Sequence, residues 1–475
     1  MVARSAAKIG ARPNTSRYKY RSAGLAAVES KSSHFCAADV PSQTTRYNIE
    51  AMPRPVGFAV LALCGSVLVP LPSAAQEKPD DKGPETGVHW RNRPSFQFGD
   101  VRIDLRLKLQ FDWRAFDPAI DEDTYDFRVR RGGINGEIGK HIDFQIERDL
   151  NPDGKWRDVF VHWQSYRQLE VTGGRFKVPF GREELIGSTD LDFAFRSLVS
   201  TAIPPARDRG VMVQGRFFRR GLTYEAGVFD GDGDNGRLEE QQFSVDDQPV
   251  TIGHSFAGRI TALPLRPLSK ALQTFRLGFA YGAVNVPEGL NSLRGETVYG
   301  TEDFFERVYV KGRRTRVGTE VSFTPGPVGF EAEWMRAYEQ RKNQGLGDVD
   351  LSDVIATGYY ASATWLLTGE KKADFNRPRH PLFNGGFGAI ELAARYETLG
   401  FESAEKVGPA FRNPRAEHIL ENSDTVWTIG VNWFANRWFR ATVNGIREEF
   451  EDARRTPIPG TTEFWSALGR LQIVF

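Results

Sequence analysis

Residues 101–113 alternate between apolar and polar side chains without a break. The odd-numbered positions from Val101 to Trp113 are all apolar, and the even-numbered positions from Arg102 to Asp112 are all charged or polar. Successive side chains of a β-strand point to opposite faces, so this segment predicts a strand with one apolar and one ionised face. Strands of soluble sheets average about 5–6 residues, whereas a strand between hydrocarbon and a water-filled lumen alternates over about 9–11 residues. The pattern therefore favours a membrane barrel over a soluble sheet.

The chain ends on another alternating segment, residues 465–475. One of its faces carries Trp465, Ala467, Leu471, Ile473 and Phe475. Because it stops on an aromatic carboxy terminus, the segment resembles the closing strand of bacterial outer-membrane proteins. The alternative is an ordinary final strand that happens to end in Phe475.

The chain between these two segments repeats the same alternation of apolar and polar residues. No long apolar run, amphipathic helix or interdomain linker interrupts residues 95–475, and turn sequences such as Asn151-Pro152-Asp153-Gly154 separate the alternating stretches. At about 24 residues for each strand and its connection, the length gives about 16 strands, an even number as in single-chain bacterial barrels. We therefore expect an all-β fold, a transmembrane antiparallel β-barrel of about 16 strands with an open aqueous channel. Residues 76–94 form a polar lead to it.

Residues 52–75 have the composition of a secretory signal peptide. Arg54 precedes an apolar stretch over residues 56–69, and Ser73-Ala74-Ala75 is a small-residue cleavage site. Because a signal peptide works near an amino terminus, we expect residues 1–51 to be an untranslated or disordered extension. Cys36 and Cys64 both precede the cleavage site, so the exported chain has no thiol, which suits an oxidising compartment.

The composition gives little support to other classes of function. The chain has 62 Lys and Arg residues against 61 Asp and Glu residues, a balance that predicts no nucleic-acid partner. The G-x-S-x-G, H-E-x-x-H and Walker patterns are absent from the sequence, so we expect no enzyme, no cofactor and no resident metal. Residues 230–236 resemble a calcium loop, but Gln241 stands where the bidentate Glu is needed, so we interpret them as a tight extracellular turn. A non-conducting outer-membrane enzyme or binding barrel is the remaining alternative.

Several stretches resemble the phosphate-selective porin O and P family and occur in the family's order. They are Phe127–Arg131, Gly174–Glu183, Arg207–Val211, Ala226–Gly231, Leu366–Glu370, Glu391–Tyr396 and Gly430–Trp433. The resemblance implies a homotrimeric porin in the outer membrane of a Gram-negative bacterium, with a third loop folded inward over about Phe180–Pro204. The apolar residues of this loop also favour an inward position, because their exposure to water would be unfavourable. Capping of the trimer axis or of a neighbouring subunit is the alternative.

The resemblance also implies an anion site. The family's arginine pair in the second strand corresponds to Arg130 and Arg131, and its third-loop arginine to Arg196, with Ser188 as a hydroxyl donor. Arg182 joins this set because burial of the loop's apolar residues leaves it facing the channel. Guanidinium groups remain charged and offer planar, bidentate hydrogen bonds to phosphate oxygens.

The arginine pair has a geometric condition. Adjacent strand residues face opposite sides, so Arg130 and Arg131 both reach the lumen only at a bulge, which Gly132-Gly133 favours. Otherwise one of them lies at an interface or a subunit contact.

The third loop departs from the family at its tip. Where the family has a Ser-Ser-Lys run, this chain has Gly187-Ser188-Thr189-Asp190, and a carboxylate raises the energy of a nearby phosphate. We expect a porin for passive uptake of phosphate or similar small anions. The alternative is a general or other-solute porin.

A basic cluster has three readings. It comprises Arg307, Lys311, Arg313, Arg314 and Arg316. It forms an anion funnel, binds phosphates of lipopolysaccharide at the rim, or is a solvated loop. Outer-membrane lipid and lipopolysaccharide are therefore expected partners, beside small anions.

Overall fold

The computed structural model of the chain describes residues 86–475, apart from 120–122, 152–153, 237–251, 292, 294, 301, 376 and 405–418. The expected extension and signal peptide, residues 1–75, lie outside the described residues. Gln241, at the end of the calcium-like pattern, also lies outside them. Within the described part, every helix is too short or too polar to cross a bilayer.

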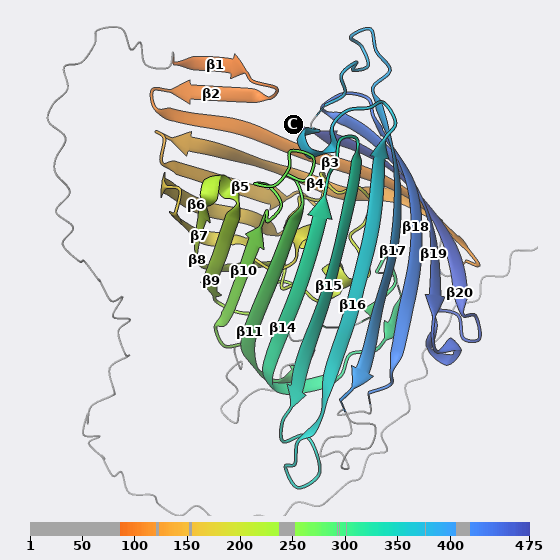
Figure 1. Cartoon of the computed structure of the whole chain (residues 1–475). Coiled ribbons are helices and arrows are strands. Elements are labelled where there is room, and N and C mark those ends of the chain that lie inside the picture. The colour runs from red at the N-terminus through yellow and green to blue at the C-terminus, as the bar shows by residue number, and fades with distance from the viewer. Residues whose placement is uncertain are drawn as a thin grey trace, which may run out of the picture. The chain divides into compact units, whose positions relative to one another are not determined.

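The described chain forms one large antiparallel sheet that closes on itself (Figure 1). The sheet has 18 strands, of which β1 (Gly87–Trp90) and β2 (Pro94–Phe98) form an added hairpin and the other 16 form the barrel wall. The wall strands are β3 (Val101–Asp117), β4 (Thr124–Ile138), β5 (Ile142–Asp149), β6 (Trp156–Tyr166), β7 (Leu169–Lys177), β8 (Arg207–Phe217), β9 (Leu222–Phe229), β10 (Ser255–Ala262), β11 (Arg276–Leu290), β14 (Tyr309–Phe323), β15 (Val328–Arg341), β16 (Leu351–Leu366), β17 (Ala389–Ser403), β18 (Asn422–Phe434), β19 (Phe439–Phe450) and β20 (Glu463–Val474). The predicted antiparallel barrel of about 16 strands is confirmed.

The first and last wall strands pair to close the ring. Trp465 of β20 lies opposite Asp117 of β3, and Val474 lies opposite Lys108. β2 pairs with the start of β3, from Val101 to Asp104. Strand β1 thus lies in the segment that we expected to be a polar lead.

Alternation along the strands divides the wall into two faces. On β20, Trp465 and Leu471 are exposed, whereas Leu468 and Arg470 are buried. Arg470 forms an ion pair with Asp112 of β3 at 2.6 Å. Apolar side chains therefore cover the outer face of the wall, and most inward side chains are polar or charged.

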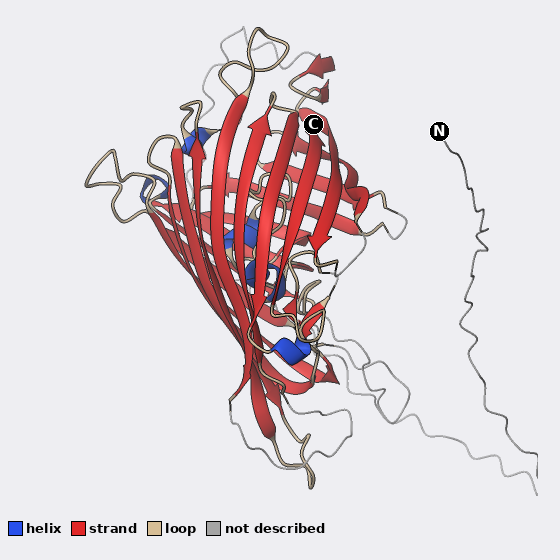
Figure 2. Ribbon diagram, turned by 90° about the vertical axis from the view of Figure 1, so that its right-hand side faces the viewer, coloured by secondary structure: helices blue, strands red, loops and turns tan. Residues whose placement is uncertain are grey.

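Two connections pack against this polar face. One holds α1 (Arg182–Leu185) and α2 (Leu198–Ala202), and the other holds the hairpin of β12 (Gly295–Glu296) and β13 (Asp303–Phe305). Figure 2 shows helical segments in the middle of the strands as well as among the loops at the edges of the view. Their buried apolar side chains form one cluster with those of β11 and β14–β20. Three 3₁₀ turns complete the described elements: η1 (Phe218–Arg220), η2 (Lys372–Asp374) and η3 (Ala453–Arg455).

Candidate functional site

The connection between β7 and β8, residues 178–206 (the third loop), is held against the wall by hydrogen bonds. The Leu198 amide donates to the Glu397 carboxylate of β17 at 2.5 Å, and the Ala194 amide donates to the Asn444 side chain of β19 at 2.9 Å. Arg470 of β20 donates to the Ala194 carbonyl. Polar side chains of the wall thus form hydrogen bonds with backbone groups that the irregular third loop would otherwise leave unpaired.

Two carboxylates organise the first half of the third loop. Glu183 accepts hydrogen bonds from the Ser197 amide at 2.8 Å and hydroxyl at 2.6 Å, and pairs with Arg395 at 3.1 Å. Glu333 of β15 accepts from the amides of Arg182 at 2.6 Å and Glu183 at 2.7 Å. Both carboxylates are buried and engaged, so they position the loop.

Arg131 and Ser188, two members of the predicted site, lie within hydrogen-bonding distance of each other. Arg131 Nη1 donates to Ser188 Oγ at 3.3 Å, and Gln110 of β3 donates to the Ser188 carbonyl at 3.0 Å. Arg131 also lies 3.4 Å from the Asp149 carboxylate, which Arg157 approaches at 2.9 Å. The third loop and the β4 wall therefore meet at a guanidinium and a hydroxyl.

The bulge in β4 lies at Arg128, not at Gly132-Gly133. Gln110 pairs with Val129, but the next residue of β3 pairs with Phe127, so Arg128 is the extra residue. An extra residue shifts every later side chain of the strand to the opposite face. The expectation of a bulge after the arginine pair is therefore wrong.

That register separates the predicted arginine pair. Arg130 lies on the outer face, where its guanidinium is 5.3 Å from the Phe127 ring centre and its Nε donates to Asn151 at 2.8 Å. Arg131 points to the inner face. The expectation that both reach the lumen is wrong, because no bulge lies between them.

The two arginines of the third loop are paired with carboxylates. Arg196 lies 2.9 Å from Glu184 and donates to the carbonyl of Ile186 at 2.6 Å. Arg182 lies 2.5 Å from Glu331. Burial opposes the charge of Arg182, but Glu331 outweighs burial and raises the pKa of the guanidinium. Both arginines hold the loop in place, a role that sequence reasoning missed.

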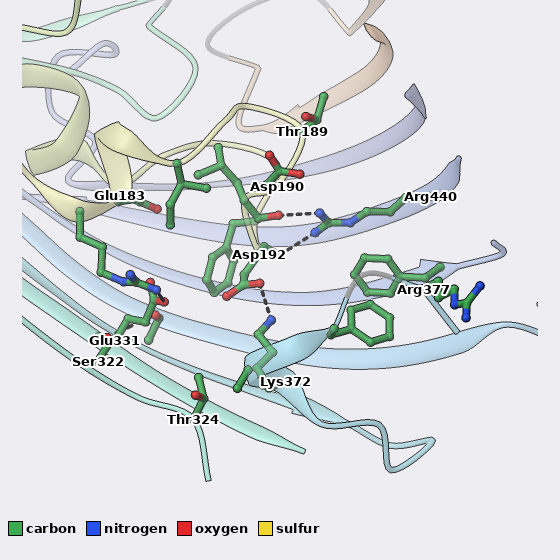
Figure 3. Close-up of a pocket in the computed structure, with 18 of the residues that line it drawn as sticks. Glu183, Thr189, Asp190, Asp192, Ser322, Thr324, Glu331, Lys372, Arg377 and Arg440 are labelled. Carbon is green, nitrogen blue, oxygen red and sulfur yellow. Dashed lines mark hydrogen bonds and ion pairs between the residues drawn. The ribbon is translucent and has the colours of Figure 1, made fainter. Parts of the chain in front are cut away.

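A cavity of about 550 Å³ adjoins the tip of the third loop (Figure 3). Lys372 reaches it from the turn between β16 and β17 and lies 2.5 Å from both Asp192 and Glu391. Arg440 of β19 donates to the Leu191 carbonyl at 2.6 Å. The turn and the wall thus fix the segment next to Asp190, whose exposed carboxylate lines the cavity.

The hairpin of β12 and β13 is a second connection on the inner side, which sequence reasoning missed. The ring of Phe305 stacks on Phe401 with centres 4.2 Å apart, and the Val298 amide donates to Glu448 at 3.0 Å. The Tyr299 ring lies 5.0 Å from Phe195 of the third loop. Apolar residues inside a connection were the available signal.

The aspartates of residues 230–236 face arginines. Asp232 lies 2.6 Å from Arg314 and 2.5 Å from Arg316, both buried. Burial opposes the charge of Asp232, but Arg316 and then Arg314 lower the pKa of its carboxyl. Asp234 lies 2.6 Å from Arg175. Within the described chain, no cluster of three or more His, Cys, Asp and Glu side chains is arranged to hold a metal ion.

These pairs also separate the members of the basic cluster. Arg314 and Arg316 are buried and neutralised, so they form neither a funnel nor a rim. Lys311 lies 3.2 Å from Glu288.

A family model of the phosphate-selective porins O and P matches residues 101–475, which include every strand of the wall. The chain belongs to the phosphate-selective porin O and P family. An uncharacterised protein of Caulobacter vibrioides is 24% identical to this porin over 356 residues, 68% of this chain and 66% of that protein. The chain thus spans just under two thirds of that relative's length.

Solved structures share the fold of this porin at low identity. Outer-membrane expressed OmpT of Vibrio cholerae is 11% identical with a TM-score of 0.51, covering 80% of this chain and 100% of that one. An anion-selective porin from Comamonas acidovorans is 13% identical with a TM-score of 0.49, covering 79% and 100%. At 11% identity, the likeness to OmpT bears on the fold alone.

Proposed function

We propose that this chain forms a water-filled, anion-preferring channel in the outer membrane of a Gram-negative bacterium, for passive uptake of phosphate or similar small anions. It works without catalysis and without a cofactor. The observation that carries this proposal is the third loop fastened to the polar face of a closed barrel of 16 strands. A barrel of this size has an aqueous interior, and a loop held across it narrows the passage.

The anion preference rests on guanidinium groups at the meeting of the third loop and the β4 wall. Arg131 and Ser188 offer adjacent hydrogen-bond donors. Arg128, displaced by the bulge, stands 4.8 Å from the Phe195 ring of the third loop. We replace Arg130 with Arg128 in the proposed site and assign Arg182 and Arg196 the role of positioning residues.

Short strands and outward-facing charges on one side of the wall support a homotrimer. Strands β5, β9 and β10 have 8 residues each, against 15 and 16 in β14 and β16. The outer face here carries Arg148 on β5 and Arg130 on the adjoining 15-residue strand β4, both exposed. A charge facing the middle of the bilayer costs about 2–4 kcal/mol, so contact with neighbouring subunits suits this side better than lipid. Lipid and lipopolysaccharide surround the apolar remainder.

Conductance in planar lipid bilayers tests the proposal. The purified protein should open stable ion-conducting steps, and the reversal potential under a potassium chloride gradient should indicate preference for chloride. Inorganic phosphate should reduce the chloride current if the site binds it. A folded barrel that never conducts contradicts the channel.

A second candidate is a porin without phosphate selectivity. The exposed carboxylate of Asp190 at the tip of the third loop favours it. A reversal potential of the opposite sign, without phosphate block, supports this candidate over the first.

A further inference from the structure

Three turns at one end of the barrel form a continuous surface, which we call the basic patch. They connect β6 to β7, β8 to β9 and β10 to β11, and comprise residues 166–169, 217–221 and 263–275. The Leu263 amide donates to the Gly221 carbonyl at 2.8 Å, and Arg266 Nη1 donates to the Arg219 carbonyl at 2.6 Å. An amide of β8 donates to the Arg167 carbonyl at 2.8 Å. Hydrogen bonds therefore join all three turns.

The basic patch carries positive charge without a counter-charge of its own. Asp and Glu are absent from the three turns. Five cations stand exposed in them, and none forms an ion pair within the described chain: Arg167, Arg219, Arg220, Arg266 and Lys270. At the opposite end of β8, by contrast, the exposed Arg209 lies 2.8 Å from Asp230. The patch is therefore suited to an anion that comes from outside the chain.

Large apolar side chains are exposed among these cations. Phe218 is 82% exposed, Leu268 75% and Tyr166 63%. Phe218, Arg219 and Arg220 have φ angles of +50°, +54° and +71°, a left-handed run that residues other than glycine rarely adopt. Strained backbone of this kind clusters at functional sites. The patch thus presents rings and cations together, as segments at a membrane interface do.

The basic patch lies at the periplasmic end of the wall. Five of the seven connections at this end of the described wall have two to four residues, whereas the third loop, at the other end, has 29. Outer-membrane barrels have short periplasmic turns and longer extracellular loops. The patch is therefore at the level of the inner leaflet of the outer membrane.

From this arrangement we infer that the basic patch binds the headgroups of anionic phospholipids in that leaflet. The inference rests on the outer-membrane location in the proposed function and adds a partner to it. The five cations attract lipid phosphates, as basic residues beside an anionic membrane surface do. Phe218 and Leu268 contact the acyl boundary, where their exposure to water is relieved. A dissolved anion would leave these apolar groups in water, so a lipid fits the patch better.

The proposed trimer gives a second reason for an anionic lipid. The basic patch lies at the ends of β6–β11, which include most of the short strands assigned to the subunit contact. The patches of neighbouring subunits therefore approach one another, and their like charges repel. Anionic headgroups between them weaken that repulsion.

Lipid adducts counted by native mass spectrometry test this inference. The full protein in mild detergent receives equal amounts of phosphatidylglycerol and phosphatidylcholine with identical acyl chains, so the ratio of their adducts reports the effect of headgroup charge. The wild-type ratio should exceed one. The Arg219→Gln, Arg220→Gln double variant should lower it about tenfold, since each exposed cation contributes about three- to fivefold.

Two matched variants separate charge from other effects. Arg209→Gln removes a cation from the opposite end of the same strand, one already paired with Asp230, and should leave the ratio unchanged. Phe218→Ser keeps all five cations, so it should reduce the adducts of both lipids and leave the ratio above one. Gel mobility before and after heating shows that each variant is folded.

The possible outcomes separate this inference from the proposed function. A wild-type ratio of one or less, or a ratio that survives the double variant, overturns the lipid site. Inorganic phosphate that displaces the lipid more than chloride does at the same ionic strength assigns the patch to dissolved anions, and the inference is then wrong. A ratio near one, together with sedimentation on purified peptidoglycan that the double variant loses, assigns the patch to the cell wall and also overturns it. Conductance is measured separately, so a conducting protein with a ratio of one overturns the inference alone. A protein that keeps the ratio but never conducts overturns the channel alone.

Discussion

Arg130 and Arg131 are adjacent in sequence but occupy different environments. Arg130 lies against the Phe127 ring on the outer face, and Arg131 meets Ser188 on the inner face. Only a charge on the inner face contributes to the potential that a permeating ion crosses, since screening limits an exposed charge to about 8–10 Å at physiological salt. The pair therefore provides a test and its own control.

Arg131→Ala should shift the reversal potential toward cations and weaken any phosphate block. Loss of one inward-facing charge at the passage should change the permeability ratio about two- to fivefold. Arg130→Ala, which removes the same group from the outer face, should leave the ratio at its wild-type value. Equal shifts in both variants contradict the assignment of faces.

Asp232 holds two buried arginines at once. Its oxygens lie 2.6 Å from Arg314 and 2.5 Å from Arg316. Removing one partner of a buried ion pair leaves an uncompensated charge and typically costs about 3–5 kcal/mol. This carboxylate therefore matters for stability more than for permeation.

Asp232→Asn should lower the temperature at which the folded band converts to the unfolded band on gels. Asp230→Asn removes a half-exposed carboxylate from the same connection and should have little effect. The pKa of Asp232 lies below its usual value, so the wild-type advantage is present above pH of about 4. It should disappear on acidification through the lowered pKa, where the carboxyl takes up a proton. An advantage that grows in acid contradicts this sign.

At the scale of the element, the sequence was sufficient to predict the strands. It was not sufficient to predict the bulge in β4 or the contacts of the third loop inside the barrel. Alternation from Val101 to Trp113 predicted β3 because period-two burial depends only on neighbouring residues. The bulge at Arg128 was not predictable, since it depends on the register with β3. The Glu184 partner of Arg196 and the Glu331 partner of Arg182 arise from the fold of the third loop, which no local pattern encodes.

Lys372 links the turn between β16 and β17 to the third loop. Lys372→Met should remove the cation that pairs with both Asp192 and Glu391, and the repulsion between these carboxylates should loosen the loop. We expect noisier single-channel current and a shift toward cations. Lys371→Met, which changes the exposed neighbour, should behave as wild type. Quiet, unshifted current in the Lys372 variant would rule out this link as a support of the passage.

The hairpin of β12 and β13 should have its own effect on conductance. Phe305→Ala removes a fully buried ring stacked on Phe401, a change that costs about 3–5 kcal/mol in a well-packed core. The hairpin should then leave the wall more readily and the single-channel conductance should change. Phe383→Ala, at 88% exposure, is the matched control. Identical conductance in both variants means that the hairpin does not border the passage.

At the scale of the whole molecule, the wall is uneven. One side, β5–β10, has strands of 8 to 11 residues with an outward charge at Arg148, and the other has strands of 12 to 17 residues with aromatic and aliphatic side chains outside. We expect native mass spectrometry in mild detergent to detect a trimer that heating in dodecyl sulfate converts to monomer. A protein that stays monomeric in several mild detergents contradicts the proposed assembly.

The seam between β3 and β20 has a consequence for biosynthesis. The amide of Phe475 donates to the Leu107 carbonyl at 2.9 Å, so the ring is closed by β20, the last wall strand in chain order. Until then, a growing chain can form only an open sheet, whose two edge strands have unpaired backbone N–H and C=O groups. Synthesis of β20 must therefore precede closure of the barrel, and the polypeptide must be kept from folding until then. A premature stop codon within β20 would therefore yield an open sheet that lacks its last strand, not a weakened barrel.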